Sequence, residues 1–274
     1  MKILIPTDFS SCANKAFRVA LWLAQQSPAE IQLLHIESTP ADWAQLDRYP
    51  EVTKRIEASK RQLDTMVAEA SQSNIEAKRF MVYNKNYHAI VEHISEHKVD
   101  FVVMGSQGSS GLKEFVVGSN TQKIVRLSQV PVLVIKDNIP DDYMIKKIAF
   151  VSDFGEEVMD QFKQFVTLAQ AWQARLYLLF VNTPTNFTDT LTTKIKMGNY
   201  AMHAPGMVEN TFIYNDHNFE KGLQQFCEEE GIDLVGMITH GDHTPWQLFN
   251  NSLTESMVNH LDIPLLTMHF SNQE

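Results

Sequence analysis

A chain of 274 residues, of which 44% are hydrophobic, is long enough for two domains of ordinary size that each bury a core. The sequence holds no apolar run near the roughly 20 residues that span a bilayer, and its formal charge of −10 comes without the basic stripe that nucleic-acid binding requires. We therefore expect neither a membrane-spanning protein nor a nucleic-acid partner.

The start of the chain and its two cysteines bear on the compartment in which the protein works. Met1 and Lys2 lead directly into a short apolar run, so we expect no signal peptide. Cys12 and Cys227 form neither a disulfide framework nor a metal-binding spacing. Together these features predict a soluble protein of a reducing compartment, the cytoplasm.

In the first half of the chain, short apolar runs alternate with amphipathic segments. The apolar runs predict strands at 3–6, 31–36, 77–82, 101–104 and 132–135. The amphipathic segments predict helices at 13–26 with Ser10 or Ser11 as N-cap, over a long stretch marked by Val52, Ile56, Leu63, Met66 and Val67, at 88–97, and from near Ser119. Such alternation is typical of right-handed crossovers in a parallel sheet that is covered on both faces.

The second half of the chain repeats this order. Strands are expected at 148–152, 176–181, 211–214, 234–238 and 265–268, and helices at 158–172 and 219–230. The segment 183–207 carries Thr, Asn and Pro with little periodicity, which predicts an irregular loop. The fold class is therefore α/β, with two tandem repeats that each form an open, Rossmann-like five-stranded parallel sheet flanked by helices. We expect domains at 1–138 and 146–274, joined by a linker marked by Pro140-Asp141-Asp142.

A glycine-rich loop follows the apolar run 101–104. It has the form Gly105-Ser106-Gln107-Gly108, nine further residues, and then Gly118-Ser119. Glycines allow backbone amides to approach a ligand closely, and phosphate oxygens are favoured at the start of a helix such as the one after Gly118. In an α/β sheet, ligands bind outside the carboxyl ends of the strands. The loop therefore predicts an anion cradle, with three nearby cations, Lys113, Lys123 and Arg126.

The same region returns 133 residues later, so the chain contains a tandem duplication. The matching pairs are Asp100 and Asp233, Met104 and Met237, Gly108 and Gly241, Ser119 and Ser252, and Pro131 and Pro264. In the second copy, Ile238 replaces Gly105 and Asn251 replaces Gly118. Two of the three glycines are lost, so we expect only the first copy to keep the cradle.

This glycine pattern, with Pro6-Thr7-Asp8 closing the first strand and Val130-Pro131-Val132 entering the last, resembles the universal stress protein family. The resemblance covers essentially the whole chain as two family domains in tandem, and it implies an adenine nucleotide alpha hydrolase-like fold. It also implies that the two copies pack as a pseudo-dimer through their last strands. The second copy resembles family members that lack the glycine pattern and do not bind ATP.

In ATP-binding members of this family, residues at the ends of the first two strands hold adenosine, and the glycine loop takes ribose and phosphates. Carried onto this sequence, the resemblance assigns the nucleotide to Pro6, Thr7, Asp8, Ile36, Met104, Gly105, Gly108, Gly118, Ser119 and Asn120. The expected cofactor is ATP, with or without Mg²⁺. Whether the intact chain forms a homodimer or binds a protein partner stays open at this point.

Charge separates the two halves of the chain. Residues 1–138 hold 16 Lys and Arg against 15 Asp and Glu, whereas residues 139–274 hold 7 against 18. A polyanionic ligand is therefore tolerated better by the first half. This agrees with the glycine pattern that the working site lies in the first half. Taken with the family resemblance, it implies a cytoplasmic stress-response or regulatory protein that binds ATP in its first half. Because no general base other than Asp8 stands out, we expect slow ATP hydrolysis at most.

Two other functions remain open from the sequence. One is a structural or protein-interaction module in which both sites are empty. The other is an enzyme of unknown substrate that shares the fold, since a fold by itself does not decide function. Titration with a nucleotide separates the first of these from the favoured function.

Two clusters resemble metal sites. The segment His93-Ile94-Ser95-Glu96-His97 matches a zinc-protease motif, but its amphipathic surroundings lead us to interpret its histidines and glutamate as the solvent side of a helix. His240, Asp242 and His243 lie in the degenerate loop, where we interpret them as exposed loop residues. No metal site is predicted, although a metal at the second cluster is left open.

Overall fold

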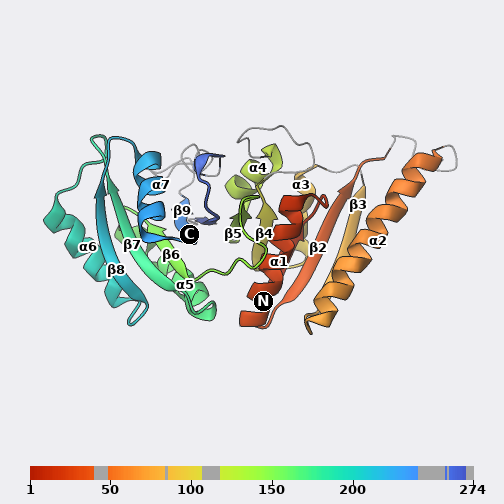
Figure 1. The fold of residues 1–274 in the computed structure, drawn as a ribbon, viewed down its shortest axis with the longest axis horizontal. Coiled ribbons are helices and arrows are strands. Elements are labelled where there is room, and N and C mark those ends of the chain that lie inside the picture. The colour runs from red at the N-terminus through yellow and green to blue at the C-terminus, as the bar shows by residue number, and fades with distance from the viewer. Residues whose placement is uncertain (40–48, 84–85, 107–117, 240–256, 258, 270–274) are drawn as a thin grey trace.

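The computed structural model describes residues 1–39, 49–83, 86–106, 118–239, 257 and 259–269. Within these ranges, one ten-stranded sheet carries its strands in the order β3-β2-β1-β4-β5-β10-β9-β6-β7-β8, with helices on both faces (Figure 1). The helices α2 and α6 lie at opposite ends of the elongated molecule (Figure 1). Across the described ranges, no helix combines the length and the hydropathy needed to cross a bilayer.

Apart from α6, which lies in a segment predicted to be a loop, the elements follow the predicted order. The first half holds β1 (Lys2–Pro6), α1 (Ser11–Gln26), β2 (Glu30–Glu37), α2 (Pro50–Gln72), β3 (Ala77–Tyr83), α3 (His88–Glu96), β4 (Phe101–Gly105), α4 (Ser119–Leu127) and β5 (Val132–Ile135). The second half holds β6 (Lys147–Val151), the 3-10 turn η2 (Glu156–Val158), α5 (Met159–Ala171), β7 (Arg175–Asn182), α6 (Thr190–Met202), β8 (Val208–Asn215), α7 (Phe219–Glu230), β9 (Leu234–Thr239) and β10 (Leu265–His269).

Each half contributes five parallel strands, and the two sets meet at a single antiparallel pair. The strands β1 to β5 pair in parallel, as do β6 to β10. At the junction β5 and β10 run antiparallel, with Leu133 opposite Leu266. The predicted α/β fold of two tandem repeats is confirmed, and their sheets form one continuous surface.

Apolar side chains on both faces of the strands explain why helices cover both faces. In β1, Ile3 and Ile5 belong to a core layer shared with α1, α2, α5 and α6, whereas Leu4 belongs to the layer of α3, α4 and α7. Such doubly buried strands are typical of parallel sheets. The first layer crosses the junction, since the rings of Phe101 and Trp172 meet edge to face at 6.0 Å between centroids.

The two halves fill the space between their first helix and central strand in opposite ways. In the first half, the buried residues Ala20 of α1 and Val103 of β4 occupy this place. The strand pairings match Val103 to Gly236 of β9, and the offset of 145 residues between Asp8 and Asp153 matches Ala20 to Phe165 of α5. A Cβ added to Gly236 would overlap the ring of Phe165. The first half therefore pairs a small helix residue with a larger strand residue, and the second half pairs a large helix residue with glycine on the strand. The total volume of the two side chains changes little.

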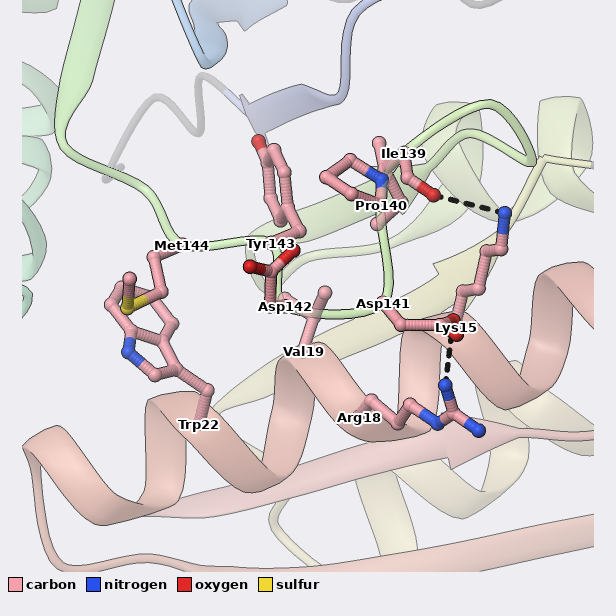
Figure 2. Close-up of a pocket in the computed structure, with 10 residues that line it drawn as sticks. All are labelled: Lys15, Arg18, Val19, Trp22, Ile139, Pro140, Asp141, Asp142, Tyr143 and Met144. Carbon is pink, nitrogen blue, oxygen red and sulfur yellow. Dashed lines mark hydrogen bonds and ion pairs between the residues drawn. The ribbon is translucent and has the colours of Figure 1, made fainter.

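The linker between the halves packs along α1. The ammonium of Lys15 donates to the carbonyl of Ile139 at 2.9 Å, and Arg18 forms an ion pair with Asp141 at 2.6 Å (Figure 2). Further along, the Tyr143 hydroxyl donates to the carbonyl of Asp233 at 2.6 Å. The linker therefore connects α1 of the first half with the start of β9 in the second. Between linker and α1 remains a small cavity of about 250 Å³, beside Trp22 and Met144 (Figure 2).

The segment 183–207, predicted as an irregular loop, contains a 13-residue helix, so that prediction is wrong. Asp189 caps α6 by accepting from the amide of Thr192 at 3.0 Å. Thr193, Met197 and Tyr200, spaced four and three residues apart, are buried and fix the helix to the core. The periodicity was hidden because the buried set begins with threonine and the opposite face is apolar too.

The interpretation of His93 as a solvent-facing residue is also wrong. Only 5% of His93 is exposed, its Nε2 lies 2.8 Å from Oε1 of Gln32, and its ring packs against Phe80. Burial lowers the pKa of His93 to about 4, and the charge of the neighbouring His97 lowers it further. Glu96 does face solvent. His93 therefore packs α3 onto β2 and β3 as a neutral side chain.

Candidate functional site

The predicted nucleotide residues gather where the direction of the chain through the sheet reverses. From β1 the chain proceeds outward to β2 and β3, and then returns to place β4 on the other side of β1. The crevice at the carboxyl ends of β1 and β4 is the usual ligand position in such a sheet. Pro6 ends β1, Gly105 ends β4, and Ile36 lies near the end of β2.

Nine of the ten predicted residues fall within the described ranges, and Gly108 lies outside them, as does Lys113. Thr7 and Met104 are buried, whereas Asp8 and Ile36 are half-buried. The side chain of Met104 packs in the core layer of α3 and α4. Gly118, Ser119 and Asn120 form the start of α4.

The turn from β1 to α1 is held by its own side chains. The amide of Thr7 donates to the carbonyl of Leu34 at 2.9 Å, and Thr7 Oγ1 accepts from the amide of Phe9 at 3.1 Å. Asp8 Oδ1 accepts from the amide of Ser10 at 3.1 Å, and Ser10 caps α1 as predicted. Phe9 adopts a φ of 64°, a left-handed conformation that costs roughly 1 to 3 kcal/mol in a non-glycine residue. The structure therefore stabilises this turn in an uncommon shape.

The end of β4 is linked directly to the start of α4. The amide of Gly118 donates to the carbonyl of Ser106 at 2.8 Å, and the Thr121 hydroxyl donates to the carbonyl of Gly105 at 3.0 Å. Because the amide of Gly118 is used in this way, the donors for an anion are the amides of Ser119 and Asn120, which have no acceptor within the helix. Helix α4 also has no side-chain cap at Gly118. The start of α4 is thus suited to accept a phosphate group.

Gly105 has a packing role that the sequence did not reveal. A Cβ at this position would lie 2.9 Å from the Cys12 sulfur and 3.1 Å from the amide nitrogen of Ala13. Glycine is therefore needed so that α1 can begin close to β4. In the second half Ile238 takes this place, the 3-10 turn η2 stands where α1 would start, and α5 begins only at Met159.

The matching turn of the second half is covered by α6. The hydroxyl of Tyr200, a fully buried residue, donates to the carbonyl of Gly155, and its ring meets Phe154 at 5.0 Å between centroids. Lys196 approaches the carbonyl of Asp153 at 3.5 Å. Asp153 itself is 7% exposed, and its Oδ2 has no hydrogen-bond partner among the described residues. The second turn is therefore closed by protein, whereas Asp8 of the first is half-buried.

The remaining second-half predictions lie outside the described ranges. These are the substituted position Asn251 and the cluster of His240, Asp242 and His243. The interpretation of that cluster as loop residues stays a prediction.

A buried polar network supports the first turn, and the sequence analysis missed it. His35 Nδ1 lies 2.8 Å from the carbonyl of Thr7, and its Nε2 lies 3.4 Å from Glu37 Oε2. Glu37 in turn accepts from Arg55 at 2.7 Å and from Ser59 at 2.9 Å. Burial on its own raises the pKa of the Glu37 carboxyl, but the hydrogen bonds from Arg55 and Ser59 outweigh it and hold the pKa below its usual value.

This network belongs to the first half alone. The strand pairings match His35 to Phe180 and Glu37 to Asn182 in the second half. The ring of His35 also packs against Phe9, with 4.5 Å between centroids. Two polar residues inside the otherwise apolar run 31–36, Gln32 and His35, were the signal that could have revealed a buried polar function there.

A buried lysine lies at the end of β5, next to the end of β4. Lys136 is 7% exposed and directly follows Ile135, whose carbonyl accepts from the amide of Ser106 at 2.8 Å. Burial lowers the pKa of Lys136 to about 8, although Asp262 and Cys12 act in the opposite direction. Lys136 therefore carries its charge at neutral pH at an energetic cost.

Comparisons with known proteins show the family to which the chain is related. The sequence profile described as the universal stress protein family matches residues 1–136. The chain is 30% identical over 145 residues to universal stress protein YxiE of Bacillus subtilis, covering 49% of this chain and 98% of that protein. It is 30% identical over 152 residues to universal stress protein MJ0577 of Methanocaldococcus jannaschii, covering 49% of this chain and 94% of that protein.

A solved structure matches the whole chain. The crystal structure of a universal stress protein from Archaeoglobus fulgidus covers 98% of both chains, with a TM-score of 0.75 and 18% sequence identity. At this identity the likeness shows the fold alone. The curated relatives match one half of the chain in sequence, and this structure matches both halves in fold.

Proposed function

Because the chain belongs to the universal stress protein family, we propose that its first half binds ATP, with or without Mg²⁺, to regulate a stress response in the cytoplasm. The observation that carries this proposal is the joint between β4 and α4. There the hydrogen bond from Gly118 to Ser106 sets the start of α4 beside the crevice at β1. A helix start at a sheet's reversal point favours phosphate groups.

The second half contributes differently in this proposal. Its turn at Asp153 is closed by Tyr200 and Lys196, and Ile238 replaces the glycine that lets the first helix approach. We therefore expect one nucleotide per chain. The halves act as an intramolecular pseudo-dimer, in domains at 1–138 and 146–274, held by the antiparallel pair of β5 and β10.

We expect the bound ATP to be hydrolysed slowly at most. Asp8 follows the end of β1 at the crevice edge, and one of its oxygens already accepts from the amide of Ser10. A general base needs to reach a water molecule in line with the γ-phosphate. An Asp8 that holds its own turn is poorly placed for that task, so binding rather than hydrolysis is the expected signal.

The test is thermal and denaturant unfolding with and without about 1 mM Mg-ATP, ADP or AMP. A ligand at about 100 times its Kd stabilises the folded state by about 2.7 kcal/mol. Wild type should shift, whereas Gly118→Trp, which fills the start of α4, should not. The matched control is Asn251→Trp at the corresponding position of the second half, which should shift like wild type. Absence of any shift in wild type with all three nucleotides would replace the proposal with the protein-interaction alternative.

A further inference from the structure

Helix α6 and the turn before it expose four large apolar side chains. Phe187, Leu191, Ile195 and Met202 are 73%, 70%, 65% and 71% exposed. Elsewhere in the described ranges, the only other large apolar residues exposed in this sense are Met1 and Met144. Leu191, Ile195 and Met202 are separated by four and seven residues, so they lie on one face of the helix. We call the four residues the α6 stripe.

Neither the core nor the fold accounts for the α6 stripe. The opposite face of α6 already supplies the core with Met197 and Tyr200. The corresponding helix of the first half, α2, exposes charged residues, among them Lys54, Glu57, Arg61 and Asp64. Four large side chains at this exposure present roughly 500 Å² of apolar surface, which is near the upper limit for a monomer and typical of an interaction site.

The α6 stripe alternates large side chains with an open position, as a surface that binds a helix does. Gly198 lies three residues after Ile195 on the same face, and nothing stands within 4 Å of where its Cβ would be. The positions 191, 195, 198 and 202 follow the alternation of four and three residues that places side chains along a helix-pairing seam. A partner side chain can therefore settle over Gly198 between Ile195 and Met202.

Charge decides which partner fits. Helix α6 contains Lys194 and Lys196 on either side of Ile195 and no carboxylate, although residues 139–274 hold 18 acidic residues against 7 basic ones. A second copy of this chain paired about Ile195 would bring like lysines together, which destabilises a helix pair. An anionic bilayer would attract two lysines but repel a protein of net charge −10.

We propose that the α6 stripe docks an amphipathic helix of a partner protein, one whose apolar side is flanked by carboxylates. The apolar side covers Leu191, Ile195 and Met202. The carboxylates pair with the exposed Lys194 on one flank and approach the half-buried Lys196, which also lies 3.5 Å from the carbonyl of Asp153, on the other. The site lies on α6 at the far end of the sheet from the nucleotide crevice and does not depend on nucleotide binding (Figure 1).

The test uses two labelled synthetic 20-residue helices with leucine at the heptad a and d positions. One carries glutamate at the flanking positions and the other carries lysine. Fluorescence anisotropy with the full chain should show the glutamate helix binding at least about 10-fold more tightly than the lysine helix. Ile195→Glu should abolish this binding. Ala58→Glu, the same kind of change on the exposed face of α2, should leave it intact.

A charge-reversed variant separates docking from nonspecific stickiness. Lys194→Glu leaves every apolar residue and the contact between Lys196 and Asp153 in place, and should weaken binding of the glutamate helix and strengthen binding of the lysine helix. Equal binding of both helices, or binding that survives Ile195→Glu, would overturn the proposal. Stripe-dependent dimerisation in sedimentation, or Ile195-dependent binding to phosphatidylserine vesicles in place of peptide binding, would do the same. Circular dichroism checks that each variant is folded.

Discussion

His35 connects the shape of the β1 turn to a charged network behind it. Its two ring nitrogens lie near the Thr7 carbonyl and the Glu37 carboxylate, so it fixes a backbone atom at the edge of the crevice. A ring nitrogen that is hydrogen-bonded in this way also sets the orientation of the imidazole. The packing of Phe9 against this ring then supports the left-handed backbone at Phe9.

Replacing His35 with phenylalanine, the residue at the matching position of the second half, should lower the free energy of unfolding by about 1 to 3 kcal/mol. The reason is that the Thr7 carbonyl loses a buried hydrogen-bond partner and Glu37 loses its neighbour. Urea unfolding measures the change, with Phe180→Leu in the second half as a control that removes buried apolar volume but no hydrogen bond. An unfolding midpoint equal to that of wild type would show that the network contributes nothing.

Lys136 should give the protein a recognisable dependence on pH. Its pKa falls from 10.5 to about 8 on folding, so the unfolded chain binds the proton more tightly between these values. The cost of burying the charge, of order 3 kcal/mol, is present in full below pH 8 and is relieved as the pH rises toward 10.5. Lys136→Met should therefore be more stable than wild type at pH 7, with the difference shrinking by pH 10.

Urea unfolding of both proteins at several pH values measures this difference and cancels the titration of all other groups. A stability difference that stays constant from pH 7 to pH 10 would show that Lys136 is not desolvated in the folded protein.

For single residues, the sequence predicted which positions matter better than it predicted why they matter. The glycine at 105 was expected because a ligand approaches it, and the structure adds that Cys12 and Ala13 occupy the space of its side chain. His35 and Lys136 belong to no motif, because their importance comes from burial, which depends on the pairing of strands far apart in the chain. Periodicity within one segment cannot show such burial.

At the scale of elements, the two halves fill the same place in the core with different pairs of residues. The first half uses Ala20 and Val103, and the second half uses Phe165 and Gly236. Gly236→Val alone should destabilise by about 1 to 3 kcal/mol, because the valine overlaps the Phe165 ring. Phe165→Ala alone should cost about 3 to 5 kcal/mol through the cavity that it leaves. The double variant, which reproduces the first-half pair, should cost clearly less than the two together.

Urea unfolding of the four proteins gives the coupling free energy directly. Additive effects would mean that the two positions do not share one space in solution.

The strands and most helices were predictable because each shows an apolar period along its own segment. Helix α6 was not, since it is apolar on its buried face and on its exposed one, and its first turn is rich in threonine. A helix that lacks a polar face has a weak period even where its geometry is regular. The missed helix and the proposed docking surface thus have the same cause.

For the molecule as a whole, we expect the junction of β5 and β10 to control whether each half associates with a second copy of itself. Residues 1–138 produced alone would leave β5, with the sequence Val-Leu-Val-Ile, as an unpaired edge. This fragment should form dimers through β5 at micromolar concentration, whereas the full chain should not self-associate through this strand. Sedimentation over a range of concentrations measures both.

Adding residues 139–274 to the fragment should convert those dimers into a one-to-one complex. A fragment that remains monomeric at about 100 μM would show that the edge is masked by other parts of the first half.

The linker along α1 has a consequence for how the sequence is free to change. In an assembly of two identical subunits, every substitution is imposed on both sides of the joint at once. Here the two sides of the joint are different segments of one chain, so a substitution on one side does not appear on the other. One half can therefore lose its glycines and acquire an apolar helix while the other half keeps its crevice. The linker, in which the Tyr143 hydroxyl donates to the Asp233 carbonyl, therefore allows the two copies of the duplicated unit to take different roles.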